Sequence, residues 1–200
     1  MVSLTIKEPF NRDKQHAAKR QAIILAAAAA FSRRGYHNTS MVAIAKSLGI
    51  TKPALYYYVR NKEEILFESH LMAYEAMEEI LQVYSSNEKT GLIQLTEIFR
   101  DFVVTLTKTG VSLLTDIDSL EDQAQRQVLI ARQSIEKQVL DIVTKGQNDG
   151  SIKDGNARLH LFFFMGALNW LNVWYDPEGA IAGEDIAAHF AEQLQTGIAA

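Results

Sequence analysis

Apolar side chains recur every three to four residues along most of this chain from residue 13 onward, which is the spacing of one face of an α-helix. The stretch that contains Ile23, Ala27 and Phe31 is also rich in alanine, the residue that favours helix most strongly. No segment of the sequence alternates apolar and polar residues as a half-buried strand does, and no internal repeat is present. The sequence therefore predicts an all-α protein of about nine helices.

Glycines and short polar residues indicate where these helices begin and end. Gly35 and Gly49 are typical helix ends, and Ser40, Thr51 and Asn61 are typical caps of the helices that follow them. The apolar stripes farther along the chain predict further helices over 61–84, 88–108, 120–147, 154–175 and 183–196.

The composition limits the classes of protein that this chain can belong to. Hydrophobic residues make up 48% of the 200 residues and charged residues 22%, which is ordinary for a globular chain with a buried core. The absence of cysteine excludes disulfides and thiolate-bound metals. The longest apolar run, 22–31, is shorter than the roughly 20 residues that cross a bilayer, and residues 1–10 lack the apolar core of a signal peptide. We therefore expect a cytoplasmic protein without a membrane partner.

Charge is distributed unevenly, although the formal net charge is only −4. Residues 1–62 contain eleven Lys and Arg against two Asp and Glu, a formal charge of +9, whereas the rest of the chain carries −13. Such an asymmetry indicates that only the first part meets a polyanion, although a solvated basic face would produce the same count.

Two short helices separated by a tight turn are expected around residues 47–51. Ile44 and Leu48 are candidates for the buried face of the first helix, Gly49 takes the turn, and Thr51 caps the second helix. The second helix carries Lys52 and three consecutive tyrosines at 56–58, of which at least one must point inward. A helix–glycine–helix pattern is common by itself, but its position in the +9 segment favours a helix-turn-helix that binds DNA.

Four short motifs in this region match one known family. They are Ala-Phe-x-x-x-Gly-Tyr at 30–36, Thr-Ser at 39–40, Ile-Ala-x-x-Leu-Gly at 44–49 and Leu-Tyr-Tyr-x-Val-x-x-Lys-Glu at 55–63. On these motifs residues 20–66 resemble the DNA-binding domain of the TetR family of transcriptional repressors, with Val59 where the family often has Phe. The resemblance implies an all-α homodimer that binds a double-stranded DNA operator through residues at the matching positions, namely Thr39, Ser40, Thr51, Lys52, Ala54, Tyr56, Tyr57 and Lys62.

The resemblance also implies a division of the chain into parts. We expect a flexible basic tail over 1–12, a DNA-binding domain over 13–60, and a ligand-binding and dimerisation domain over 61–200. As a further hypothesis, Lys7 and Arg12 of the tail reach over the DNA backbone, although a disordered end would have the same composition.

The segment Gly-Ala-x-Asn-Trp-x-x-x-Trp-Tyr at 166–175, followed by Gly179, resembles a TetR subgroup that senses acyl-coenzyme A thioesters in lipid or sterol catabolism. Many of those relatives carry Arg where this chain has Val173, so Arg126 and Arg132 are candidates to hold the anionic coenzyme instead. An uncharged aromatic or hydrophobic compound is the alternative effector. The expected ligand-binding residues are Phe99, Phe102, Val103, Leu106, Arg126, Phe163, Asn169, Trp170 and Trp174.

The last two expected helices carry apolar stripes that a second copy of the chain could cover. We expect these helices to form a four-helix seam in a two-fold symmetric homodimer, which would place two half-sites about one helical turn apart or a multiple of it. The expected interface residues are Leu161, Phe164, Leu168, Leu171, Ile186, Phe190 and Leu194.

No pattern of catalytic or metal-binding residues stands out. The five histidines are scattered without metal-ligand spacing, the carboxylates at 116–122 straddle a helix start, and no Gly-rich phosphate loop or Gly-x-Ser-x-Gly occurs. We therefore expect no enzyme activity, no metal and no cofactor. The remaining alternative is a helical scaffold whose basic end binds acidic protein or membrane, and such binding would not depend on duplex sequence.

Overall fold

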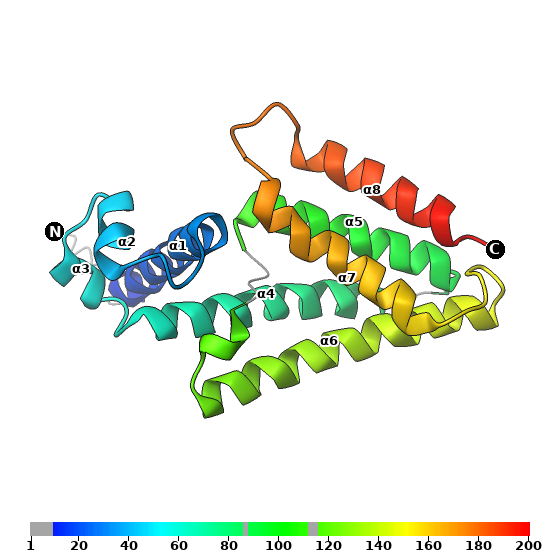
Figure 1. The fold of residues 1–200 in the computed structure, drawn as a ribbon, viewed down its shortest axis with the longest axis horizontal. Helices are drawn as coiled ribbons and strands as arrows, with labels where there is room; N and C mark the ends of the chain where they lie inside the picture. Colours follow the sequence, from blue (N-terminus) through cyan, green and yellow to red (C-terminus); the bar gives the residue numbers. More distant parts are fainter. Residues whose placement is uncertain (1–9, 86–87, 112–115) are drawn as a thin grey trace, which may run out of the picture.

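The computed structural model describes residues 10–85, 88–111 and 116–200, which form eight α-helices and one short 3-10 helix (Figure 1). The all-α class predicted from the sequence is confirmed, and within the described residues the one strand-like feature is an isolated antiparallel bridge between Ile152 and Ala199. None of the helices described is long and apolar enough to cross a membrane. The helices are α1 (Phe10–Arg34), α2 (Met41–Ser47), α3 (Lys52–Tyr56), α4 (Lys62–Tyr84), α5 (Gly91–Thr109), η1 (Ile117–Ser119), α6 (Asp122–Asn148), α7 (Ala157–Trp174) and α8 (Gly183–Ile198).

The helices form two groups that α4 joins (Figure 1). At one end of the molecule, α1, α2 and α3 pack together and α1 lies against α4. In the larger group, α5 is central and packs against α4, α6, α7 and α8. Because α4 runs from the small group into the large one, a movement of α4 would move the small group.

Side-chain caps begin the helices where the sequence places them. Ser40, Thr51 and Asn61 each accept a hydrogen bond from the backbone N–H three residues ahead, at the starts of α2, α3 and α4. Gly35 and Gly49 have φ values of 81° and 65°, a left-handed conformation that glycine adopts without strain, and they follow α1 and α2. The caps and these two glycines together fix the lengths of the short helices.

Two glycines allow α5 to approach its neighbours closely. A Cβ atom on Gly91 would collide with the backbone of Gly146 in α6, and a Cβ atom on Gly183 at the start of α8 would collide with Thr107 in α5. Side chains larger than hydrogen at these positions would push the helices apart, so both glycines are required for the packing of the larger group.

Several helix boundaries differ from the expected ones by a few residues. α3 ends at Tyr56, so Tyr57 lies in the turn that follows the helix, and α7 begins only after its cap, Asn156. At the other end α1 begins at Phe10, which makes residues 10–12 of the expected tail helical. Residues 1–9 of that tail, Lys7 included, lie outside the described residues.

Candidate functional site: a helix-turn-helix surface

The small group of helices is built around a tight turn between α2 and α3. Ile44 of α2, Leu55 of α3 and Val59 after α3 are at most 1% exposed and pack into the core beneath. Gly49 turns the chain with its positive φ, and the N–H of Ile50 donates to the carbonyl of Ala45. This is the helix-turn-helix geometry that the sequence predicted around residues 47–51.

The outer face of this unit carries polar and aromatic side chains. Lys52, Tyr56 and Tyr57 are exposed, and 69% of Tyr57 is open to solvent. The Nζ of Lys52 lies 5.7 Å from the ring centroid of Tyr56, so a cation and a phenol stand side by side. Ser40 and Thr51 are exposed beside them at the starts of α2 and α3. Five of the eight residues expected to contact DNA are therefore exposed on the helix-turn-helix.

The other three residues of that set have different surroundings. Thr39 is only 1% exposed and its hydroxyl donates to the carbonyl of Gly35 at 2.9 Å, so the side chain is part of the turn after α1. The Nζ of Lys62 lies 4.0 Å above the centroid of the Tyr36 ring, and burial lowers the pKa of this lysine. Ala54 is half-buried. In this structure the Thr39 hydroxyl is bonded within the domain and the Lys62 ammonium lies over an aromatic ring of the same domain.

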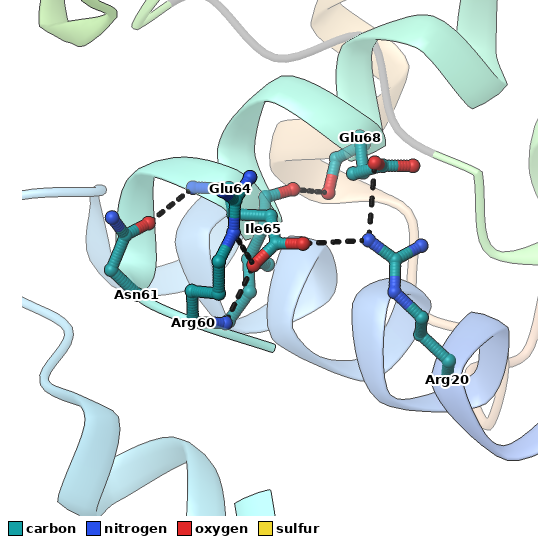
Figure 2. A network of polar contacts seen from close by, with 7 residues as sticks. Arg20, Arg60, Asn61, Glu64, Ile65 and Glu68 are labelled. Atoms are coloured by element: carbon teal, nitrogen blue, oxygen red, sulfur yellow. Dashed lines mark hydrogen bonds and ion pairs between the residues drawn. The ribbon is translucent and has the colours of Figure 1, made fainter. Parts of the chain in front are cut away.

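A network of charged side chains holds α1, the α3–α4 connection and α4 together (Figure 2). Glu64, three residues after the cap Asn61, accepts from the guanidinium of Arg20 at 2.9 Å and from the backbone N–H of Arg60. Arg20 also pairs with Glu68 at 3.1 Å. Burial would raise the pKa of Glu64, but the hydrogen bonds from Arg60 and Arg20 hold that pKa below its ordinary value. The network fixes α1 and the α3–α4 connection relative to α4.

Sequence reasoning did not find this network. A capping box, in which an acidic residue three positions after the cap returns to the preceding backbone, is the signal that could have found it. The partner Arg20 is 44 residues away in sequence, so no local pattern identifies it.

The larger group buries the first half of the expected ligand site. The expected residues on α5 are at most 6% exposed, and the rings of Phe99 and Phe102 lie 5.0 and 6.0 Å from the ring of Phe164 in edge-to-face contact. In this structure they form packed core. The buried residues of this part of the expected set are Phe99, Phe102, Val103 and Leu106.

The two faces of α7 are reversed relative to the expectation. Phe163, Trp170 and Trp174, expected to bind ligand, are exposed, with Asn169 half-buried among them. The residues expected in the dimer interface are instead buried within the chain, except that Phe190 is half-buried and its ring lies 6.2 Å from that of Trp174. The buried ones are Leu161, Phe164, Leu168, Leu171, Ile186 and Leu194. Helical spacing had grouped these residues correctly by face, but α7 is apolar on both faces.

Two surface grooves differ in charge. A groove of about 880 Å³ between the starts of α4 and α6 contains Arg126, but five carboxylates against two arginines line it. A groove of about 380 Å³ between α6 and α7 has an apolar floor of Leu140, Leu161 and Phe162, with Arg158 at its side. No side chain among the described residues pairs with the Arg158 guanidinium. The second groove is thus the better match for an anionic amphiphile.

His70 on α4 is a buried titratable group within the larger core. It is 1% exposed, no described atom bonds its Nε2, and burial lowers its pKa from 6.5 to about 4. The unfolded chain binds a proton on this histidine below pH 6.5 while the folded chain does not, so acidification from pH 6.5 to 4 costs stability. We expect His70 to contribute a loss of about 2 kcal/mol between pH 7.5 and pH 5.

Urea unfolding at the two pH values measures this loss. The variant His70→Leu should show a smaller difference in unfolding free energy between pH 7.5 and pH 5 than the wild type. The exposed His189 provides the matched control, because His189→Gln should leave the pH dependence unchanged. An equal pH dependence in His70→Leu and the wild type would contradict a neutral buried imidazole.

Comparison with known proteins shows which family both parts of this chain match. Residues 23–68 match the family described as bacterial regulatory proteins, tetR family, and residues 91–198 match the tetracyclin repressor-like C-terminal domain. The fatty acid metabolism regulator protein of Bacillus subtilis (strain 168) is 29% identical over 169 residues, which cover 78% of this chain and 82% of that protein. The transcriptional repressor KstR2 of Mycolicibacterium smegmatis is 25% identical over 193 residues, 92% of each chain.

Two solved structures show the same fold. The ketosteroid transcriptional regulator KstR2 of Mycobacterium tuberculosis superposes with a TM-score of 0.78 at 18% identity, over 91% of this chain and 95% of that chain. AibR in complex with isovaleryl coenzyme A and operator DNA superposes with a TM-score of 0.69 at 23% identity, over 88% of this chain and 97% of that chain.

Proposed function

This chain belongs to the TetR family of bacterial regulatory proteins, and from that premise we propose that it is a repressor that binds a palindromic operator as a homodimer and leaves it when a hydrophobic effector binds. The observation that carries the proposal is the exposed surface of the helix-turn-helix, where Lys52, Tyr56 and Tyr57 stand together in the segment with formal charge +9. A regulator has no need of a catalytic centre, and the family consists of DNA-binding proteins rather than enzymes.

We assign DNA contact to the exposed residues of this surface, with Ser40 and Thr51 beside Lys52. Lysine and hydroxyl groups bind phosphate oxygens and base edges, and tyrosine can do both with little loss of side-chain freedom. We place the boundary of the DNA-binding domain near residue 60, although the pairs of Arg20 with Glu64 and Glu68 make the first turns of α4 a structural part of it.

We place the dimer interface on the exposed face of α7. Apolar side chains follow this face at helical spacing over nearly the whole helix, and Trp174 extends it to Phe190 of α8. An exposed apolar stripe of this length is unusual for a monomer, and a second copy of the same stripe related by a two-fold axis would cover it. The stripe contains Leu159, Phe163, Trp170, Val173 and Trp174, while Phe162 lies at its edge and lines the α6–α7 groove.

We propose that the effector is an acyl-coenzyme A thioester. Two observations support this class: the relatives named above include a fatty acid metabolism regulator, and the α6–α7 groove joins an apolar floor to the unpaired cation of Arg158. The structural neighbour AibR is itself complexed with isovaleryl coenzyme A and operator DNA. Arg158 therefore replaces Arg126 as the residue that we expect to hold the coenzyme, because the groove around Arg126 is acidic.

A thermal-shift titration of the purified protein tests the effector class. Acyl-coenzyme A thioesters at 100 times their Kd should stabilise the protein by about 2.7 kcal/mol, whereas coenzyme A or the free acid alone should stabilise it less. The substitution Arg158→Ala should raise the Kd of the thioester by about tenfold or more, because it removes a charge-assisted hydrogen bond.

The matched control is Arg126→Ala, which should leave the thioester response unchanged. Stabilisation by uncharged aromatic compounds, with no response to any thioester, would contradict the acyl-coenzyme A proposal and favour the alternative effector class. An equal loss of response in both arginine variants would contradict the assignment of the α6–α7 groove.

A further inference from the structure

The first three turns of α1 lie outside the segment that matches the family. That match begins at residue 23, whereas α1 begins at Phe10. Between residues 12 and 22 every side chain is exposed except those of His16 and Arg20, which are half-buried. A helix segment with so little buried surface gains almost no stability from hydrophobic packing, so these two residues are its anchors.

Both anchors connect the segment to the DNA-binding surface. The imidazole of His16 lies 5.2 Å from the ring of Tyr57 and 4.9 Å from the ring of Tyr58, directly after α3. Arg20, one turn farther along, pairs with Glu64 and Glu68 of α4 (Figure 2). The segment therefore lies against the turn that follows α3 and against the first turns of α4.

The charged side chains exposed along this segment are mainly cationic. Arg12, Lys14 and Lys19 are exposed, with Asp13 as the acidic residue among them. Arg12 precedes His16 by four residues and so lies on the same face about one turn away, at a distance of about 6 Å along the axis. Lys19 follows His16 by three residues on the same side. The contact of His16 with Tyr57 thus brings these cations next to a side chain assigned to DNA.

We propose that residues 12–19 of α1 form a second DNA contact, in which Arg12 and Lys19 bind backbone phosphates that flank the half-site contacted by α3. The proposal rests on the DNA-binding function proposed above and adds a contact outside the helix-turn-helix. His16 acts as the positioning residue, because its ring holds the segment against Tyr57 and Tyr58. Phosphate contacts of this kind add affinity and register but no base specificity.

The salt dependence of DNA affinity measures this contact. Fluorescence anisotropy with a labelled 40-base-pair duplex, over a range of KCl concentrations, gives the slope of log K against log salt. Each phosphate neutralised contributes about −0.9 to that slope, so Arg12→Ala with Lys19→Ala should reduce its magnitude by about 3.6 in a dimer. The two alanines favour helix, and circular dichroism should show that α1 is retained.

The control variant is Lys137→Ala with Lys153→Ala, which removes two exposed cations of the larger group and should leave the slope unchanged. His16→Ala should reduce the slope in the same direction as the Arg12/Lys19 variant, while His160→Ala should not. A wild-type slope in the Arg12/Lys19 variant, at unchanged affinity, would overturn the second contact and leave the helix-turn-helix assignment standing. Failure of the wild type itself to bind any duplex would overturn the proposed function and this inference with it.

Discussion

Replacing Lys52 and Tyr57 together by alanine is expected to lower the affinity for operator DNA by about 100-fold or more while the protein remains folded. Each side chain is exposed on the helix-turn-helix, so its loss removes a contact to DNA without opening the core. A specific contact to a base edge is worth about 1–3 kcal/mol, and two such losses amount to about 3 kcal/mol, or roughly two powers of ten in Kd. Anisotropy with a duplex selected from a random pool gives the Kd, and thermal unfolding checks the fold.

Two further variants separate DNA contact from structure at this surface. Tyr57→Phe keeps the ring that packs against His16 and removes only the hydroxyl, so any loss of affinity belongs to that group. Thr39→Ala removes a buried hydroxyl that bonds the carbonyl of Gly35, and it should lower the melting temperature more than the affinity of the folded protein. If the Lys52/Tyr57 variant bound the selected duplex within threefold of the wild type, α3 would not be the recognition helix.

Introducing glutamate at Phe163 and Trp170 should convert the proposed homodimer into a monomer. Both side chains are exposed in the single chain, and Trp170 is 63% open to solvent, so the substitutions should leave the monomer fold intact. In a two-fold interface, four carboxylates would be buried without partners, and the desolvation cost would far exceed the free energy of a typical contact. Sedimentation velocity at 10–50 μM should show a monomer, and affinity for a two-half-site duplex should fall at the same time.

Val83 on α4 provides the control for this substitution, because it is exposed and apolar but lies off α7. Val83→Glu should remain dimeric with wild-type affinity for DNA. Phe164→Ala is expected to have the reverse effect, because the Phe164 ring packs against Phe99 and Phe102 in the core. This substitution should lower the free energy of unfolding by about 3–5 kcal/mol and leave dimerisation of the folded protein unchanged. A dimer that survives glutamate at both Phe163 and Trp170 would place the interface on another face.

The features that the sequence predicted well are local ones. Ser40, Thr51 and Asn61 cap helices because each hydrogen bond joins residues only three apart, and Gly49 marks the turn because few other residues adopt its φ. The helix-turn-helix could therefore be predicted before any tertiary contact was known. The residues expected to contact DNA came from the family resemblance, and five of those eight side chains are exposed.

The features that the sequence could not predict depend on contacts between distant residues. Periodicity showed which residues of α7 share a face, but both faces are apolar, and only the packing of α5 against α7 determines that Phe164 turns inward and Trp170 outward. The resemblance placed Lys62 among the residues that contact DNA, whereas in the structure its ammonium lies over Tyr36, 26 residues earlier. The ion pair of Arg20 with Glu64 could not be predicted from a local pattern either, because the two residues are 44 positions apart in the sequence.

We claim that this chain recognises a particular DNA sequence, and a ratio of two affinities tests that claim. The wild-type protein is titrated, at one salt concentration, against the selected duplex and against a scrambled duplex of the same length and composition. We expect a Kd ratio of about 10³ or more, with one dimer bound per pair of palindromic half-sites. A ratio near one, with binding that only salt weakens, would contradict the claim and identify the helix-turn-helix end as a general polyanion-binding surface.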